Sequence, residues 1–398
     1  MANSIFIIEK IKGLKNAKQF DVLLFGSVVS ITAVGLYVLY ILAPTLNTTS
    51  QPNLGEEMFN RQIFAIITGV ILSLVLASVE YKHFRIPSYV AYIGSIALLI
   101  IVMFFGTGDE TWGSRSWMTL PIIGNFQPSE LTKVAYAVVA ASFFERIKLN
   151  EATRMDYLKL IFYTGFPILL ILLQGDTGTA LVFIFIFLIM AFFCGLKYRY
   201  IFAGIGAAFA AVPLLWTFVL ADYQKMRVLT FLNPELDKHD GGWQVIRSKA
   251  AVGAGQLFGR NLDDSVQSQF SRVPAVETDF IFAAMGEKLG FIGCVLFVLL
   301  IMFMLLRCVY LASKASDQFG SFQVIGLTGM MAFHFIENIG MCIGILPVTG
   351  IPLPFVSRGG SSMLTNYVAL GIILSVSMMR DKTHYRENQS NSVIMPDI

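Results

Sequence analysis

The chain has 398 residues, of which 56% are hydrophobic and 14% are charged, and its mean hydropathy is +0.68. A globular protein of this size cannot cover its surface with so few polar groups, whereas lipid tolerates an apolar surface. The composition therefore excludes a soluble enzyme with a single anchor. We expect an all-α polytopic membrane protein. The formal net charge of +3 says little, because basic residues flank the apolar segments.

The apolar segments predict ten transmembrane helices, since about 20 apolar residues cross the hydrocarbon core. In chain order these spans are Val22–Leu42, Ile63–Val79, Ile86–Phe105, Leu131–Phe144, Leu160–Gln174, Gly178–Gly195, Tyr200–Ala221, Phe280–Leu306, Ile325–Ile345 and Leu364–Met379. The whole chain, residues 1–398, then forms one integral membrane domain.

Lys and Arg residues gather in the two tails and in alternate loops, which places both termini in the cytoplasm. Residues 1–21 and 380–398 become cytoplasmic tails, and residues 222–279 become a long extracytoplasmic loop between the seventh and eighth spans. The first apolar stretch lacks a small-x-small cleavage site, so we do not expect a cleavable signal peptide. The cysteines lack metal-ligand spacing and are expected to pack as inert residues; they are Cys194, Cys294, Cys308 and Cys342.

Polar residues cluster before the fourth span. Arg115 and Trp117 precede it, and each has an ordinary reading, as a surface charge and as an interfacial aromatic residue. Pro128 suits the start of a helix. Glu130 and Lys133 are three residues apart and share a face, so we expect them to pair. The pair has either a structural or a substrate-binding role.

Asp176 lies in the short Gln174–Gly178 connection between the fifth and sixth spans. The two glycines beside this acid allow a tight reversal, and Asp is a favoured residue at a helix N-terminus. Capping alone would explain its presence.

The 222–279 loop is far longer than an ordinary connection, and loops of this length are usually functional or disordered. Its apolar residues are spaced as on short amphipathic helices that lie on the bilayer surface; they include Trp243, Val245, Ile246, Leu257 and Phe258. Arg247, Lys249 and Arg260 add positive charge. The combination suits a lipid-linked anionic substrate, with generic binding of lipid headgroups as the alternative.

The loop ends at Asp279, a carboxylate at the outer mouth of the eighth span. Thr278 is a candidate N-cap for that span, and stabilisation of the helix N-terminus is an ordinary role for Asp279. Glu287 is expected about 12 Å deeper, inside the hydrocarbon, at 1.5 Å per residue.

The last outer loop, Leu346–Ser362, contains three prolines and three glycines. The prolines fix a rigid non-helical path, and its Gly-Gly-Ser-Ser end presents backbone amides to an anion. On the preceding span, His334 and Glu337 are three residues apart, and we expect them to form a buried hydrogen-bonded pair.

The strings QPSE, QSQFSRVPAVETDFIFA and LPVTGIPLPF occur in this order. Together they resemble the SEDS family (shape, elongation, division, sporulation) of peptidoglycan glycosyltransferases, from Gly113 to Ser362. The Val-Thr-Gly before Ile-Pro-Leu-Pro looks more like the elongation type (RodA) than the division type (FtsW). Two departures from most relatives are Arg358, where Tyr is usual, and Arg247, where Gln is usual.

The resemblance implies polymerisation of lipid II on the outer face of the bacterial cytoplasmic membrane, with release of undecaprenyl diphosphate. Asp279 matches the essential acid of the family and is the candidate catalytic base. The candidate substrate-binding residues are Arg115, Trp117, Lys133, Lys249, Arg260, Ser357, Arg358 and Ser361. Glu130, Asp176 and Glu287 are candidate supporting residues.

The family also implies a class B penicillin-binding protein, a transpeptidase, as partner, together with other membrane proteins of the elongation complex and no nucleic acid. A divalent cation, Mg²⁺ or Mn²⁺, could assist the reaction, although no ligand cluster can be read from spacing; no organic cofactor is expected. The alternatives are a lipid II flippase, a division-type septal polymerase and a noncatalytic scaffold. Asp279 discriminates between the polymerase and the flippase, because polymerisation needs a base and flipping does not.

Overall fold

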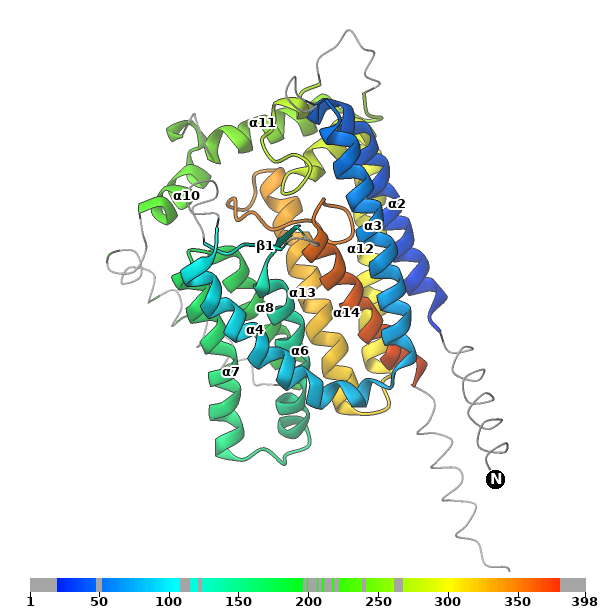
Figure 1. Cartoon of the computed structure of the whole chain (residues 1–398), viewed down its shortest axis with the longest axis vertical. Helices are drawn as coiled ribbons and strands as arrows, with labels where there is room; N and C mark the ends of the chain where they lie inside the picture. Colours follow the sequence, from blue (N-terminus) through cyan, green and yellow to red (C-terminus); the bar gives the residue numbers. More distant parts are fainter. Residues whose placement is uncertain are drawn as a thin grey trace, which may run out of the picture.

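The computed structural model describes residues 20–47, 52–107, 115–120, 124–195, 222–237, 241–260 and 268–379, with isolated positions 199, 206, 210 and 217. The protein is nearly all-helical, as expected (Figure 1). A short antiparallel hairpin of β1 (Met118–Leu120) and β2 (Gly124–Phe126) is the departure from the all-α prediction. The predicted span Tyr200–Ala221 lies outside the described residues, apart from three isolated positions.

Eight helical segments in the described residues are long and apolar enough to cross a membrane. Seven come from α2 (Val22–Leu42, extended by η1, Ala43–Leu46), α3 (Leu54–Ser78), α4 (Arg85–Phe105, preceded by η2, Tyr81–Phe84), α7 (Arg154–Leu173), α8 (Thr177–Cys194), α13 (Gln318–Cys342) and α14 (Gly360–Met378). The eighth is α12 (Ile281–Ser313), described below.

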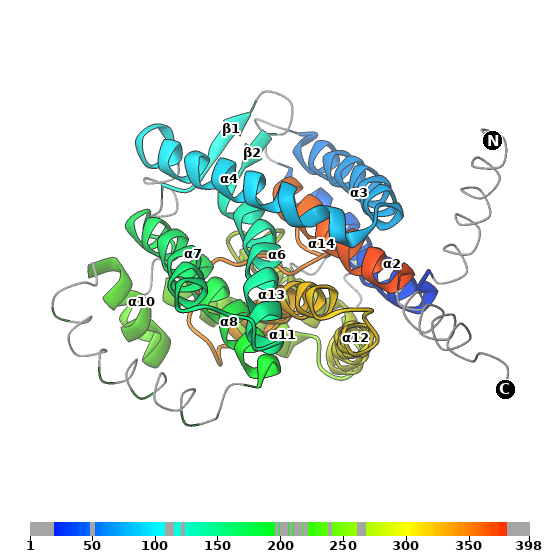
Figure 2. The same ribbon diagram turned by 90° about the horizontal axis from the view of Figure 1, so that it is seen from below.

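The predicted span Leu131–Phe144 is longer in the structure, where it forms α6 (Pro128–Lys148). Its composition is less apolar than that of the eight spans, because it is buried by protein rather than exposed to lipid. Figure 2 shows α6 and α13 in the middle of the bundle, surrounded by α4, α7, α8, α12 and α14. A central helix of this kind can carry the charges of Glu130 and Lys133.

Local capping chemistry sets where several helices begin. Pro128 occupies the first turn of α6, as predicted. Thr153 and Asp156 form a reciprocal capping box that starts α7 before the predicted Leu160. The carboxylate of Asp317 accepts the N–H of Gly320 at 2.9 Å and begins α13.

The helix α12 is broken at Gly290, where φ is 66° and ψ is −174°. The part from Phe291 to Ser313 is roughly 34 Å long at 1.5 Å per residue, enough to cross the hydrocarbon core alone. The depth of Glu287 in the hydrocarbon stays a prediction; the structure adds that the helix is interrupted three residues after it, at Gly290.

The long outer loop contains short helices, in agreement with the sequence pattern: α10 (Asp222–Leu232), η3 (Pro234–Leu236), α11 (Gly241–Ala254) and η4 (Phe270–Arg272). Figure 1 shows α10 and α11 at one end of the bundle. The helix α11 packs against α12 and α13.

Ion pairs join helices at the opposite end of the bundle. Arg307 at the far end of α12 donates to both carboxylate oxygens of Asp21 beside α2. The other pairs there are Lys82 with Asp317, Arg85 with Glu145, and Arg146 with Asp156. Several basic residues that the sequence analysis assigned to the cytoplasmic side thus also hold the helices together at this end of the bundle.

Candidate active site at the outer mouth

Asp279 belongs to the turn Pro274–Phe280, called here the Asp279 turn, which directly precedes α12. Its N–H donates to the carbonyl of Ala275 at 3.0 Å. Its own carbonyl accepts the side-chain amide of Asn338 in α13 at 2.7 Å, and that amide also donates to the carbonyl of Ile351 at 2.8 Å. Because Asn338 is fully buried, one side chain fixes both the Asp279 turn and the last outer loop.

Ser357 makes a second link between the Asp279 turn and the loop. Its hydroxyl donates to the carbonyl of Thr278 and accepts the N–H of Leu353. The hydroxyl of Thr278 donates to the carbonyl of Ala275 at 3.2 Å. The N-cap position of α12 is Phe280, which has no side-chain cap bond, so the expectation that Thr278 caps the helix is wrong.

The carboxylate of Asp279 lies against the backbone of Gly350, where φ is 75°. A Cβ atom at Gly350 would lie 3.4 Å from Oδ2 of Asp279. On the other side of this stretch, a Cβ atom at Gly178 in α8 would lie 2.8 Å from Cβ of Thr349. The loop therefore passes between the start of α8 and the candidate base.

The pKa of Asp279 is raised to about 6, chiefly by burial and in smaller part by the negative charges of Glu277 and Asp176. The hydrogen bond from Thr278 and the positive charge of Arg227 act in the opposite direction. A carboxylate with this pKa is ionised at neutral pH and is a stronger base than an ordinary Asp. These are the properties that a general base requires.

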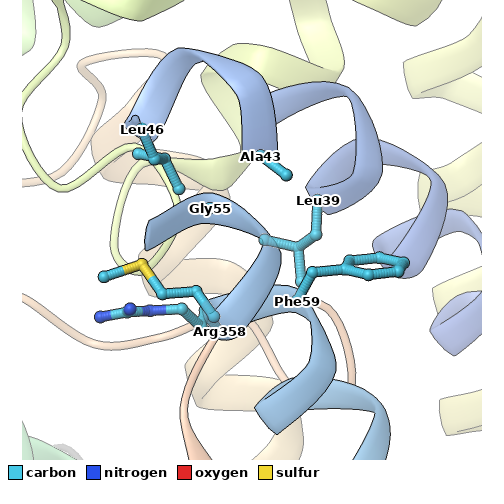
Figure 3. Close-up of a pocket in the computed structure, with 7 residues that line it drawn as sticks. Leu39, Ala43, Leu46, Gly55, Phe59 and Arg358 are labelled. Atoms are coloured by element: carbon cyan, nitrogen blue, oxygen red, sulfur yellow. The ribbon is translucent and has the colours of Figure 1, made fainter. Parts of the chain in front are cut away.

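Arg358 is held beside the same turn. Its N–H donates to the carbonyl of Glu277 at 2.8 Å, and its guanidinium nitrogen lies 3.9 Å from the carboxylate of Glu277. The side chain borders a shallow recess at the outer ends of α2 and α3 (Figure 3). The other residues of that recess are Leu39, Ala43, Leu46, Gly55, Met58 and Phe59.

Glu130 and Lys133 form the expected pair: Nζ of Lys133 donates to Oε1 of Glu130 at 2.7 Å, and both side chains are buried. The same Nζ lies 2.9 Å from Nε2 of His334. Because an ammonium only donates, Nε2 is the acceptor. Glu337 accepts a hydrogen bond from the hydroxyl of Thr349 at 2.9 Å. The expected His334–Glu337 pair is therefore wrong, because each side chain bonds to a neighbouring element instead.

Asp176 caps the N-terminus of α8, which is the helix-capping role that the sequence analysis considered sufficient to explain it. It accepts the N–H of Thr179 at 2.9 Å and the hydroxyl of the same residue at 2.8 Å. It also accepts the side-chain amide of Gln127, just before α6, at 3.1 Å. Asp176 thus supports the site by joining α8 to the start of α6.

Lys249 is exposed on α11, and its side chain runs over the end of α13. A Cβ atom at Gly344 would lie 2.0 Å from Cε of Lys249, so only glycine leaves room for this path. The neighbouring Ser248 donates its hydroxyl to the carbonyl of Cys342 at 2.7 Å. Lys249 is thereby placed beside the same loop that contacts Asp279.

The unusual Arg247 stacks over the ring of Trp243, 3.9 Å from its centroid, one helical turn earlier on α11. Its guanidinium is therefore partly engaged within the helix.

Arg115 is exposed, and its N–H donates to the carbonyl of Gln174 at 3.1 Å. Trp117 forms an isolated bridge with Thr107. Contacts of Arg115 and Trp117 with substrate stay predictions.

Glu287 is fully buried and accepts the N–H groups of Gln269 and Phe270 at 3.0 and 2.8 Å. It supports η4 as a structural residue. The N–H of Arg260 donates to the carbonyl of Glu287 at 2.9 Å.

Ser361 is buried and borders a largely apolar cavity of about 140 Å³ between β2, α6 and α14. The other lining residues of this cavity are Phe126, Leu131, Val134, Leu364, Thr365 and Val368.

No three His, Cys, Asp or Glu side chains are grouped as metal ligands within the described part of the chain. The carboxylates of Asp176 and Glu337 are already used, by a helix cap and by Thr349. A divalent cation therefore stays a prediction, and no step below depends on one.

Sequence reasoning missed three residues of this site. Asn338 and Gln62 are buried polar side chains within or beside apolar spans, a pattern that marks functional positions. Gln62 donates to the carbonyl of Ser357 at 3.1 Å and accepts the N–H of Gly359 at 3.2 Å. Arg227 on α10 is recognisable only through its electrostatic effect on Asp279.

Comparison with known proteins places the chain in a family. Residues 21–382 match the family model of FtsW, RodA and SpoVE, described as cell cycle proteins. The chain belongs to this family. It is 34% identical to the peptidoglycan glycosyltransferase MrdB of Escherichia coli K12 over 81% of this chain and 86% of the relative. It is 33% identical to the probable peptidoglycan glycosyltransferase FtsW of Trichlorobacter lovleyi, over 90% and 93% of the two chains.

Solved structures agree with this assignment. A chain from a peptidoglycan synthase complex that coordinates polymerisation and crosslinking matches with a TM-score of 0.76 and 28% identity, over 91% of this chain and 99% of that one. The rod-shape-determining protein RodA of Thermus thermophilus matches with a TM-score of 0.65 and 26% identity, over 91% and 97% of the two chains.

Proposed function

We infer that this family member is a peptidoglycan glycosyltransferase that polymerises lipid II into glycan strands during cell elongation. It works at the outer face of the bacterial cytoplasmic membrane, with both termini in the cytoplasm, and releases undecaprenyl diphosphate. The observation that carries the proposal is the position of Asp279. Its carboxylate, with a pKa of about 6, lies at the outer mouth against Gly350, beside the paired charges of Glu277 and Arg358.

Glycosyl transfer with inversion needs a base that takes the proton from the attacking sugar hydroxyl. Asp279 supplies it, because its carboxylate is ionised at neutral pH yet more basic than usual. Burial also keeps solvent away from one side of the carboxylate. The backbone around it is held by Asn338 and Ser357, so the base stays in one position during the reaction.

The departing diphosphate needs positive charge as its bond to the sugar breaks. Lys249, whose side chain lies against Gly344 just before the last outer loop, and Arg358 within that loop supply that charge. Lys133 is held by Glu130 and His334 beneath the loop and adds a buried cation to the same electrostatic field. Arg115, Trp117, Arg260 and Ser361 contribute further contacts to the substrate.

A class B penicillin-binding protein is the proposed partner, because the matched chain from a peptidoglycan synthase complex works beside a crosslinking activity. Other membrane proteins of the elongation complex are expected to bind in the cell. The Val348-Thr349-Gly350 sequence favours the elongation assignment over the division one.

The competing function is a lipid II flippase, since buried charges and a broken helix also occur in transporters. Purified protein with its cognate transpeptidase, assayed in liposomes with Mg²⁺, with Mn²⁺ and with a chelator, separates the two. The proposal predicts long glycan from labelled lipid II. Movement of lipid II between leaflets without glycan under every cation condition would support the flippase.

A further inference from the structure

The turn that follows α11 presents large apolar side chains outward. Leu257 and Phe258 are 58% and 80% exposed. Beside them, Phe291 and Ile292 are 64% and 42% exposed at the start of the spanning part of α12. These four residues are called here the outer apolar cluster. The two pairs are more than 30 positions apart in the chain, but main-chain hydrogen bonds join their segments.

The junction is made of main-chain hydrogen bonds. The break at Gly290 leaves the first N–H groups of the following helix without helical acceptors, and unsatisfied N–H groups are costly near lipid. The N–H of Phe291 donates to the carbonyl of Gln256 at 2.8 Å, and the N–H of Ile292 donates to the carbonyl of Leu257 at 3.1 Å. The turn therefore caps the spanning helix.

Glycines at this junction allow the backbones of the turn and of α12 to approach each other closely. A Cβ atom at Gly290 would lie 2.1 Å from the backbone nitrogen of Gly259, and one at Gly255 would lie 1.9 Å from the carbonyl oxygen of Gly286. Backbones that approach so closely move together. The orientation of Leu257 and Phe258 is thus fixed relative to α12.

The outer apolar cluster continues the lipid-facing side of α12. Phe291 is followed on the same face by Val295 and Leu299, which are 40% and 54% exposed. Because the helix from Phe291 onward is just long enough to cross the hydrocarbon core, Phe291 lies at the outer boundary of the membrane. Leu257 and Phe258 extend this apolar face at the same level.

Cationic residues flank the cluster. Arg260 follows the turn and is partly buried, and Lys288 precedes the break and is also partly buried. Aromatic and basic side chains side by side are typical of the headgroup region of a bilayer, where phosphate groups accept hydrogen bonds. A membrane lipid therefore fits both the apolar and the charged parts of the surface.

We propose that the outer apolar cluster is an interfacial anchor, in which Leu257 and Phe258 insert into the outer leaflet and bind phospholipid. The anchor holds α11, and with it Lys249, at a fixed height above the membrane. It goes beyond the proposed function, since it does not depend on the reaction that the site performs.

The test uses the full-length protein in nanodiscs made of phospholipid brominated either near the headgroup or deep in the acyl chain. Phe258→Trp places a fluorophore in the turn, Leu257→Trp repeats the measurement, and Leu299→Trp is the matched control within the spanning helix. The parent protein supplies the background of native tryptophans. Iodide is added as an aqueous quencher, with and without the partner transpeptidase.

The anchor predicts that shallow bromine quenches the added fluorescence at 257 and 258 more strongly than deep bromine does, and that iodide has little effect. Leu299→Trp should show the reverse preference for bromine depth. Quenching of the turn by iodide but not by bromolipid would overturn the proposal. Loss of bromolipid quenching when the transpeptidase is present would also overturn it, because a protein would then cover the turn.

Discussion

The side-chain amide of Asn338 donates to the main-chain carbonyl of Asp279 at 2.7 Å, although the two residues are 59 positions apart. The same amide holds the carbonyl of Ile351 at 2.8 Å. The candidate base is therefore positioned by the core helix α13, and the last outer loop is fixed to the same point.

Replacing Asn338 with Ala should lower kcat for glycan synthesis at least about tenfold, while the KM for lipid II changes little. The substitution leaves two carbonyls without their donor, which costs about 1–3 kcal/mol for each buried group, and frees the Asp279 turn. The matched control is Gln323→Ala, another fully buried amide on α13, which lies near Tyr81 and away from the site. Equal losses of kcat in both variants would contradict a positioning role for Asn338.

The rate of glycan synthesis should rise as the pH increases through about 6, because Asp279 acts only when it is ionised. Glu277→Gln removes a negative charge that raises the pKa of Asp279, so this limb of the pH profile should move to lower pH. Initial rates measured between pH 4.5 and about 8 at lipid II concentrations well below KM, which report the free enzyme, test both statements. A limb that stays in place in the Glu277 variant would argue against Asp279 as the titrating group.

The Glu130–Lys133 pair should show energetic coupling. Removing either partner alone leaves a buried charge unpaired, at a cost of roughly 3–5 kcal/mol, whereas removing both avoids that cost. We expect Glu130→Gln and Lys133→Met each to lower the melting temperature in detergent more than the double variant does. Simple additivity of the three unfolding free energies would show that the pair is not coupled.

Gly344→Ala should displace Lys249, since the new methyl group would occupy the path of its side chain. The positive φ of 74° at Gly344 adds backbone strain, so the melting temperature should fall slightly. We expect a higher KM for lipid II, with a similar effect in Lys249→Ala and no further effect when the two are combined. Independent, multiplying effects on KM would contradict this explanation.

Hydropathy predicted most of the membrane helices, because polar residues interrupt the apolar runs between spans; Thr153 and Asp176 are two that also cap helices. The break at Gly290 was missed because hydropathy carries no record of a backbone angle. The extent of α6 was underestimated because a helix buried by protein does not need an apolar composition.

Contacts in the site were predictable where both partners lie one turn apart on the same helix, as for Glu130 and Lys133. Partners that come from different helices were not predictable. His334 bonds to Lys133 of α6, and Glu337 bonds to Thr349 of the last outer loop, so the shared face of these two residues was misleading. Asn338 was missed for the same reason, since both of its acceptors are backbone atoms of other segments.

The central claim is that Asp279 is the base of a glycan polymerase, and comparison of the wild type with Asp279→Asn tests it most directly. Because the folded-state pKa of Asp279 lies above the ordinary value of 3.8, its ionised form opposes folding above pH 6. The Asn variant should therefore be at least as stable as the wild type at pH 7.5. With labelled lipid II and the transpeptidase partner, we expect long glycan from the wild type and none from the stable Asn variant. Substantial glycan from the Asn variant would contradict the account.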